Sequence, residues 1–361
     1  MNKNIFAAAA LAACAGAASA QSGVTIYGTV DAGLVHEGGG AFGTVNKLTS
    51  GVGTYSRLGF RGVEDLGGGL SGIFTLESGF RVDTGEQAET GNLFNRQAFL
   101  GLKSPFGTVT LGRQNTPYHN TLVQVADPFG TGFAGTSRNL FPDWGTNVRA
   151  SNVLMYSAPE TMGFTGDVMY SPGEQTGSVT AGRQTGASVG YTWGPLNVRF
   201  AYNNKNFDIA AAPGIAPAVR GTGTNKLLAA NYDFRVVKAY VAYEVDKGFN
   251  SSPLGNTANP FGYVVAPVAS TDSNEWLVGL TAPLGTGTVM ASWMRKNDKT
   301  PFNQDARSWG VGYLYPLSKR THLYTAYGRI DNRNGAGYTV ANNTEAGTGD
   351  RAFNLGVRHS F

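Results

Sequence analysis

The chain has 361 residues, of which 51 are glycine and 1 is cysteine; only 14% are charged, and the formal net charge is +4. Glycine is a poor helix former, so its excess argues against a helical protein, and the absence of a triplet repeat excludes a collagen. A single cysteine excludes an intramolecular disulfide framework and a cysteine-based zinc cluster. The hydrophobic share of 41% excludes a disordered tail. We therefore expect one large all-β body.

The first twenty residues have the features of a secretory signal. Lys3 supplies a positive charge, residues 5–13 form a short apolar core, and Ala18-Ser19-Ala20 is a small-residue cleavage site. Alternatively, the residues before Cys14 resemble a lipoprotein cleavage box, with Cys14 as the lipidated residue. The first expected strand follows the Ala20 site without a polar tether, which favours the simpler interpretation. We expect a signal peptide at residues 1–20 and one domain at residues 21–361.

The region after the signal consists of short segments in which apolar and polar residues alternate. Residues 24–34 are the first such segment and residues 352–361 the last. Alternation with period 2 turns one face of a strand to an apolar phase and the other to water. No later segment has the roughly 18 consecutive apolar residues of a transmembrane helix. Similar segments recur near Leu58, Phe74, Leu154, Val168, Tyr191, Phe200, Val241, Val278, Tyr313 and Tyr324.

The connections between these segments fall into two classes. Tight connections are expected at residues 64–68, 104–106, 194–195, 282–285 and 316–319, and long polar ones at residues 37–48, 83–92, 173–182, 208–223, 247–270 and 333–348. Short turns at one end and long loops at the other are typical of outer-membrane barrels. About sixteen strands share the 341 residues after the signal (361 − 20). This leaves about 21 residues for each strand with its connection, which suits strands of about ten residues.

A soluble β-sandwich or propeller is the alternative fold. It also explains the alternation, but soluble domains carry about 25% charged residues, against 14% here. No repeat of about 40 to 50 residues is present, which argues against a propeller. The low charge is what a barrel whose exterior faces lipid requires, so a membrane barrel is favoured.

Four stretches resemble the Gram-negative general porins, in particular the β-proteobacterial type. They are QSGVTIYGTVD (21–31), SRLGFRGVEDLGGGLSGIFTL (56–76), LFNRQAFLGLKSPFGTVTLGRQ (93–114) and GVRHSF (356–361), while residues 171–300 match by pattern only. The resemblance implies a sixteen-stranded antiparallel transmembrane β-barrel in the outer membrane, a homotrimer, and passive diffusion of small hydrophilic solutes and ions. It implies contact with membrane lipid and lipopolysaccharide. It also implies that Phe361 belongs to a signal for the outer-membrane assembly machinery, unless that ring simply joins an aromatic girdle.

The longest connection runs from Asn115 to about Val148. Loops of this length are uncommon unless they are functional. In the resembled family the loop after the fifth strand folds into the lumen and narrows it, and Asp127-Pro128-Phe129-Gly130 loosely resembles the family's loop tip. The loop holds only two acids, Asp127 and Asp143, against Arg138. We therefore expect it to contribute weak negative charge at most.

The wall opposite this loop is predicted to be basic. Alternation turns Arg57, Arg61 and Arg149 into the lumen, because Leu58 and Leu154 occupy the opposite parity. The resemblance adds Arg113 to this cluster. Alternation disagrees there, because Val109 and Leu111 share its parity; either the pleat breaks at Gly112 or protein covers both faces of the strand. Further wall candidates are Arg96 and Arg199.

Guanidinium groups stay charged and donate several directional hydrogen bonds, and rings of arginine in a pore favour anions. The predicted function is therefore a weakly anion-selective diffusion channel, and a solute-specific channel is the alternative. A membrane-embedded hydrolase and an adhesin with a plugged lumen are less favoured. We predict no catalytic, cofactor or metal site and no nucleic-acid partner. The histidines are scattered, and the glycine motif at residues 38–43 precedes no helix.

Overall fold

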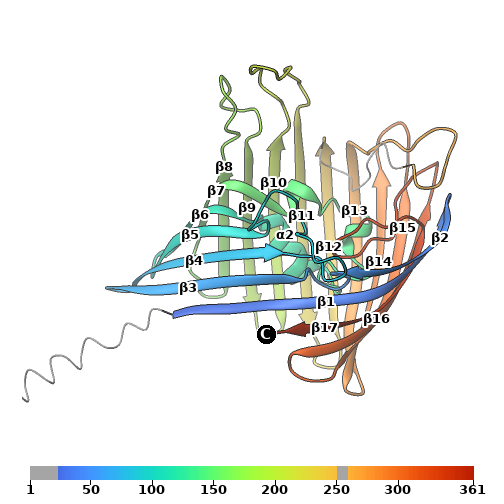
Figure 1. The fold of residues 1–361 in the computed structure, drawn as a ribbon, viewed down its shortest axis with the longest axis horizontal. Helices are drawn as coiled ribbons and strands as arrows, with labels where there is room; N and C mark the ends of the chain where they lie inside the picture. The colour runs from blue at the N-terminus through green and yellow to red at the C-terminus, as the bar shows by residue number, and fades with distance from the viewer. Residues whose placement is uncertain (1–22, 250–258) are drawn as a thin grey trace, which may run out of the picture.

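The computed structural model describes residues 23–249 and 259–361 (Figure 1). The predicted signal peptide with its cleavage site, the alternative lipidation site Cys14 and the predicted first mature residue Gln21 lie outside the described residues. Within the described residues, no helix is both long and apolar enough to cross a lipid bilayer.

Antiparallel strands form a single closed sheet, with β17 lying beside β1 (Figure 1). Apart from β2 and β3, which both pair with β1, each segment pairs with the one before it and the one after it. The segments are β1 (Gly23–Gly40), β2 (Gly43–Ser50), β3 (Arg57–Gly67), β4 (Leu70–Gly79), β5 (Gln97–Ser104), β6 (Gly107–Asn115), β7 (Arg149–Ser157), β8 (Phe164–Ser171), β9 (Gln184–Trp193), β10 (Leu196–Asn206), β11 (Thr222–Asp233), β12 (Lys238–Gly248), β13 (Asp272–Leu284), β14 (Gly287–Asp298), β15 (Ala306–Pro316), β16 (Thr321–Asn332) and β17 (Arg351–Ser360).

The segments β2 and β3 act as one barrel strand with an interruption at residues 51–56. Both pair antiparallel with β1, β2 along its second half and β3 along its first half. The barrel therefore has sixteen strands, which confirms the predicted fold. The last residue completes the pairing of β17 with β1. The backbone N–H of Phe361 donates to the carbonyl of Gly28, and the backbone N–H of Gly28 donates to the carbonyl of Phe361, both at 3.1 Å.

The prediction of a long loop at residues 37–48 is wrong. β1 continues to Gly40 and β2 begins at Gly43, so a two-residue turn joins them. The glycine run at residues 38–40 suggests a loop by composition, but it serves close packing. A Cβ on Gly40 would overlap the carbonyl oxygen of Thr348, which belongs to the long connection before β17. The strands thus extend because a distant segment packs against them.

The two faces of the wall carry opposite kinds of residue. Apolar side chains stand exposed on the outside, for example Ile26 at 61% and Leu100 at 65%. On the inner face, Glu77, Asn203 and Glu244 are almost completely buried. This arrangement inverts that of a soluble protein and is the one expected for a barrel in lipid.

The connection between β6 and β7 (residues 116–148), here called the lumen loop, packs against the inner wall. It contains α2 (Pro117–Thr121), η1 (Leu122–Ala126), η2 (Ser137–Asn139) and η3 (Gly145–Asn147). Asn231 on β11 donates its side-chain amide to the carbonyl of Val125 at 3.0 Å. Ser292 on β14 donates to the carbonyl of Gly135 at 2.7 Å. The loop is therefore bonded across the strands β11 to β14.

Glycines on the inner wall make room for the loop backbone. A Cβ on Gly310 would overlap the Cα of Gly135, and one on Gly328 would overlap the carbonyl oxygen of Ala134. Because both backbones touch there, no side chain can stand between wall and loop. Gly310 and Gly328 therefore let the lumen loop lie directly on the wall.

We expect Gly310→Val to weaken this contact. Its side chain would clash with Gly135, at a cost of about 1–3 kcal/mol, and the loop would leave the wall while the barrel stays closed. The prediction is a changed single-channel conductance in planar bilayers with a normal heat-induced gel shift. Gly166→Val on β8 is the control, because a Cβ there meets only one atom, at 3.6 Å. Equal conductance of the two variants would contradict the prediction.

Candidate pore constriction

The lumen loop begins with a capped helix fixed to the wall. The hydroxyl of Thr116 accepts from the backbone N–H of His119 at 3.1 Å, and Pro117 occupies the first turn, where it has no N–H to lose. Thr116 also donates to the carbonyl of Asn147 at the far end of the loop. The hydroxyl of Tyr118 donates to Glu244 on β12 at 3.0 Å. The two ends of the loop are thus bonded to each other and to the barrel.

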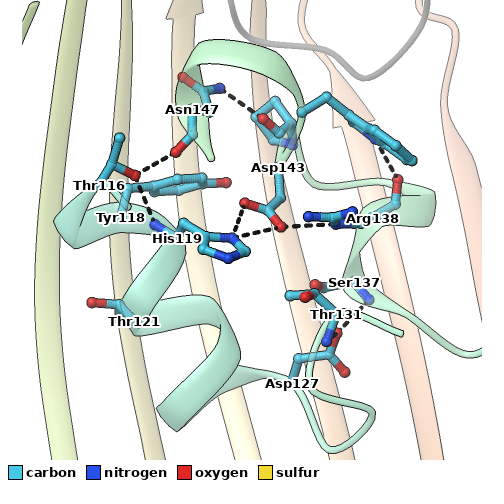
Figure 2. A network of polar contacts seen from close by, with 12 residues as sticks. Thr116, Tyr118, His119, Thr121, Asp127, Thr131, Ser137, Arg138, Asp143 and Asn147 are labelled. Carbon is cyan, nitrogen blue, oxygen red and sulfur yellow. Dashed lines mark hydrogen bonds and ion pairs between the residues drawn. The ribbon is translucent and has the colours of Figure 1, made fainter. Parts of the chain in front are cut away.

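A buried charge cluster joins the two halves of the loop. Figure 2 shows His119 and Arg138 directed at the carboxylate of Asp143. His119 Nδ1 lies 2.8 Å from Asp143 Oδ1, and Arg138 Nε lies 3.0 Å from Asp143 Oδ2. Burial opposes ionisation of Asp143, but the charges and hydrogen bonds of His119 and Arg138 outweigh it and hold its pKa at about 2. Burial lowers the pKa of His119, although Asp143 opposes that shift.

Asp127 organises the turn at the loop tip. Its carboxylate accepts from the backbone N–H groups of Phe129 at 2.8 Å, Thr131 at 3.0 Å and Ser137 at 2.7 Å. The ring of Phe129 is 3% exposed and lies over Gly312 on β15. Residues 127–130 lie in the lumen loop, where Asp127 and Phe129 are buried and anchor it. The carboxylates of Asp127 and Asp143 are both used inside the protein.

The loop tip rests on the interruption between β2 and β3. The carboxylate of Asp31 accepts from the backbone N–H groups of Val52 at 3.1 Å, Gly53 at 3.2 Å and Thr54 at 3.1 Å. Consecutive N–H groups that converge in this way form a nest for an anionic group. The carbonyl of Val52 in turn accepts from Phe133 of the loop at 2.8 Å. The interruption is therefore a fixed part of the wall.

Two of the predicted arginines converge on a carboxylate that the sequence reasoning missed. Glu77 on β4 is 3% exposed. Its oxygens lie 2.6 Å from Arg96 Nε and 3.4 Å from Arg57 Nε, and it accepts from the hydroxyl of Tyr27 at 3.1 Å. Glu77 has the inward parity of β4, opposite Phe74 and Leu76, so alternation contains the signal that places it here.

The ring of Tyr55 contacts two arginines of the same group. The guanidinium carbon of Arg96 is 4.8 Å from the centre of its ring, and that of Arg149 is 5.5 Å from it. Cations over an aromatic face are attracted by its quadrupole. Arg149 Nε and Arg96 Nη1 are buried and have no hydrogen-bond partner. No periodicity marks Tyr55, because it belongs to the interruption at residues 51–56.

Arg113 joins this group because the strand register changes beside it. The pairing of β6 with β7 shifts register between Gly112 and Gln114. Of the two explanations offered by the sequence, a pleat break at Gly112 or protein on both faces of the strand, this shift is the pleat break. Arg113 then donates to Ser151 at 2.9 Å and lies 3.2 Å from Glu89. A cavity of about 290 Å³ lies here, lined by Tyr55, Glu89, Arg113, Arg138, Trp144, Gly145, Thr146, Val148 and Arg149.

Comparison with known proteins places this geometry in a family. A family model described as Gram-negative porin matches residues 7–335. The chain belongs to the Gram-negative porin family. An outer membrane porin protein of Bordetella pertussis is 34% identical, and outer membrane porin protein 32 of Delftia acidovorans is 31% identical, each aligned over 100% of both chains. The solved anion-selective porin from Comamonas acidovorans is 26% identical, with a TM-score of 0.75 over 94% of this chain and 100% of that one.

The predicted outer-membrane location and barrel channel architecture are thereby confirmed for this porin. Its predicted wall arginines divide into two sets. Arg57, Arg96, Arg113 and Arg149 are linked through Glu77, Tyr55 and the cavity. Arg61 instead lies over the ring of Tyr27 at 5.4 Å, four residues further along β3. Arg199 on β10 donates to Gln124 of the lumen loop at 2.9 Å. The contacts of Arg61 and Arg199 are thus with residues other than Arg57, Arg96, Arg113 and Arg149.

We expect Asp143→Asn to expose the lumen loop of this porin to trypsin. The change leaves Arg138 buried without its carboxylate, and breaking a buried ion pair costs about 3–5 kcal/mol. Cleavage after Arg138 should appear in the mass spectrum of the variant, while the wild type resists because Arg138 is 2% exposed. Asp83→Asn, in the exposed connection between β4 and β5, should remain resistant. An uncleaved Asp143→Asn barrel would contradict the role of the pair.

Acidification should also weaken the loop packing. Burial lowers the pKa of His119. The imidazole of His119 therefore binds a proton more tightly when the loop is displaced than when the loop is packed. Packing therefore loses stability as the pH falls below about 6.5, the ordinary value for histidine. We expect faster deuterium uptake in residues 117–147 at pH 5 than at pH 7, after correction for intrinsic exchange. The asparagine of His119→Asn does not titrate in this range, so the variant should show no such difference in uptake. A difference that persists in the variant would mean that another group causes the pH dependence.

Proposed function

We propose that this porin is a diffusion channel for small hydrophilic solutes and ions, with a weak preference for anions. The observation that carries the proposal is the group of four arginines, Arg57, Arg96, Arg113 and Arg149, whose ion pairs among residues 23–249 and 259–361 are with two carboxylates, Glu77 and Glu89. Both acids of the lumen loop are engaged inside the protein, Asp127 by backbone N–H groups and Asp143 by His119 and Arg138. The proposed constriction therefore has a net positive charge.

The arrangement suits anions because charged groups in a narrow pore act at short range. Basic rings lower the electrostatic barrier for anions and raise it for cations. Glu77 and Glu89 offset part of the field, so the preference is weak. The anion-selective porin from Comamonas acidovorans, similar over its whole length, supports this selectivity. Ionic strength should reduce the preference, since the screening length falls to about 3 Å at 1 M salt.

The assembly proposals follow from the family. We propose a homotrimer in contact with lipid and lipopolysaccharide, and recognition of Phe361 by the outer-membrane assembly machinery. Phe361 is 44% exposed, and its backbone is paired with Gly28. Its side chain is therefore accessible from outside the barrel once the last strand has formed. Cross-linking of the purified protein tests the trimer, and deletion of Phe361 tests assembly.

A solute-specific channel is the second candidate, and the cavity beside Arg113 favours it. The cavity combines the rings of Tyr55 and Trp144 with the guanidinium groups of Arg138 and Arg149 in about 290 Å³. Such a site has the size for a small anionic solute with an apolar part. This candidate requires flux that saturates with solute concentration. Ohmic current without block by small organic anions supports the diffusion channel instead.

We expect Arg57→Ala combined with Arg149→Ala to shift selectivity toward cations. The change removes two of the four positive charges and leaves Glu77 less compensated. Reversal potentials across a salt gradient in planar bilayers should show a permeability ratio that moves toward cations by a few fold or more.

Two further variants make this test specific. Glu77→Gln, which removes a negative charge at nearly constant volume, should move the reversal potential in the opposite direction. Lys319→Ala with Arg320→Ala removes two positive charges from the exposed turn between β15 and β16. This control should leave the reversal potential close to the wild-type value. If Arg57→Ala with Arg149→Ala has no greater effect than this control, the four arginines do not form the constriction.

A further inference from the structure

The connection between β4 and β5 carries a carboxylate on a short exposed arm. Before the arm, the backbone N–H of Ala88 donates to the carbonyl of Gly79 at 2.9 Å, and after it the backbone N–H of Gly79 donates to Asn95 Oδ1 at 2.8 Å. Residues 89–93 between these two anchors are exposed. They include one acidic residue, Glu89. We call residues 89–93 the acidic arm.

The acidic arm holds Glu89 at the arginine group of the proposed constriction. Glu89 Oε2 lies 3.2 Å from Arg113 Nη2. The other oxygen, Glu89 Oε1, accepts from the side-chain amide of Asn92 at 2.9 Å, within the arm. Glu89 also lines the cavity of about 290 Å³, together with Arg113, Arg138 and Arg149. Its carboxylate therefore lies where the carboxylate of an anionic solute would bind.

Glu89 is held much less firmly than Glu77, the other carboxylate of the arginine group. Glu77 is almost completely buried and lies against two arginines, Arg57 and Arg96. The Glu89 side chain is 49% exposed, and Arg113 is its one ion-pair partner in the part of the chain that the structure describes. Ion pairs of this exposure contribute little to stability, because water competes for both charges. Glu89 can therefore leave Arg113 at small cost, whereas Glu77 is part of the wall.

The cavity beside the arm also offers a hydrogen-bond donor that the protein leaves unused. Arg149 Nε is buried and has no hydrogen-bond partner within the described residues. The rings of Tyr55 and Trp144 line the same cavity. A buried donor without an acceptor is costly, so the cavity favours a solute that brings an acceptor oxygen and an apolar body. A small carboxylate with a hydrocarbon part has both.

We propose that Glu89 is a tethered competitor of anionic solutes, which sets how long a small carboxylate stays in the cavity. This inference rests on the proposed anion channel. At rest Glu89 occupies Arg113, an arriving carboxylate displaces it, and Glu89 returns to Arg113 as the solute leaves. Conduction requires sites that bind a solute weakly enough to release it. Several arginines around one small cavity would otherwise retain carboxylates, so Glu89 favours their release.

Tethering explains why an exposed ion pair has this effect. A group tethered beside its partner acts at an effective concentration on the order of millimolar. Solute carboxylates at lower concentrations therefore meet an Arg113 that is already occupied, and at higher concentrations they displace Glu89. With Glu89 the flux of a carboxylate stays nearly proportional to its concentration, and without Glu89 the flux saturates sooner.

The experiment measures block of the chloride current by benzoate in planar bilayers that contain the full refolded barrel. Glu89→Gln removes the charge and keeps an amide oxygen that can still accept from Asn92. We expect this variant to lower the half-blocking benzoate concentration about twofold to fivefold, the range for loss of an exposed ion pair. Glu86→Gln is the matched control, because Glu86 lies in the same connection and accepts from Thr84 within it. The control should be blocked at the wild-type concentration.

A second comparison separates displacement from a general change in charge. Arg113→Gln removes the ion-pair partner of Glu89, so adding Glu89→Gln to it should change the half-blocking concentration no further. An interaction between two residues appears as such non-additivity in a double-mutant cycle. An unspecific field effect of the lost charge would persist in the Arg113→Gln background.

The proposal is wrong if Glu89→Gln is blocked at the same benzoate concentration as the wild type, if Glu86→Gln shifts this concentration equally, or if the shift persists in full without Arg113. Reversal potentials of the same wild-type channels test the proposed function separately. A wild type that prefers chloride, with no shift in Glu89→Gln, overturns this inference alone. A wild type that prefers cations overturns the channel selectivity as well.

Discussion

The structure depends on one constraint: within hydrocarbon no water is present to satisfy backbone N–H and C=O groups, so the wall must bond entirely to itself. A sheet meets this condition only when its first and last strands pair. Here β1 pairs with β17 along ten residues, and the final residue Phe361 adds two more hydrogen bonds to Gly28 (Figure 1). The interruption between β2 and β3 is tolerated because the carboxylate of Asp31 accepts from the N–H groups that leave the ladder.

Closure also encloses the lumen loop, which packs on the inner wall through apolar and polar contacts together. Leu122, Val125 and Phe133 of the loop belong to one buried cluster with Leu227, Leu277 and Met294 of the wall. Buried polar groups also demand partners, so Tyr118, Asn231 and Ser292 add hydrogen bonds, while the loop backbone lies directly on Gly310 and Gly328. The same demand explains why Asp143 pairs with His119 and Arg138, since a buried carboxylate without partners is costly.

These anchoring contacts decide which charges remain for the proposed constriction. The carboxylates of the loop are bound within its own fold, so in the part of the chain that the structure describes the arginines of the wall form ion pairs with Glu77 and Glu89. The guanidinium groups of Arg96 and Arg149 both lie against the ring of Tyr55, whose quadrupole attracts each cation.

The sequence alone determined the wall, because side-chain direction in a strand alternates locally and needs no knowledge of distant partners. Alternation thus identified the membrane barrel, about sixteen strands, and the parity of Arg57 and Arg149. Only the tertiary structure decided that Arg113 joins Arg149, because a register shift turns it, and that residues 37–48 continue as strand, because Thr348 packs on Gly40. It alone showed that Tyr55 and Glu89 meet the arginines. These pairings join irregular segments far apart in the chain, and irregular segments carry no periodicity from which a contact can be predicted.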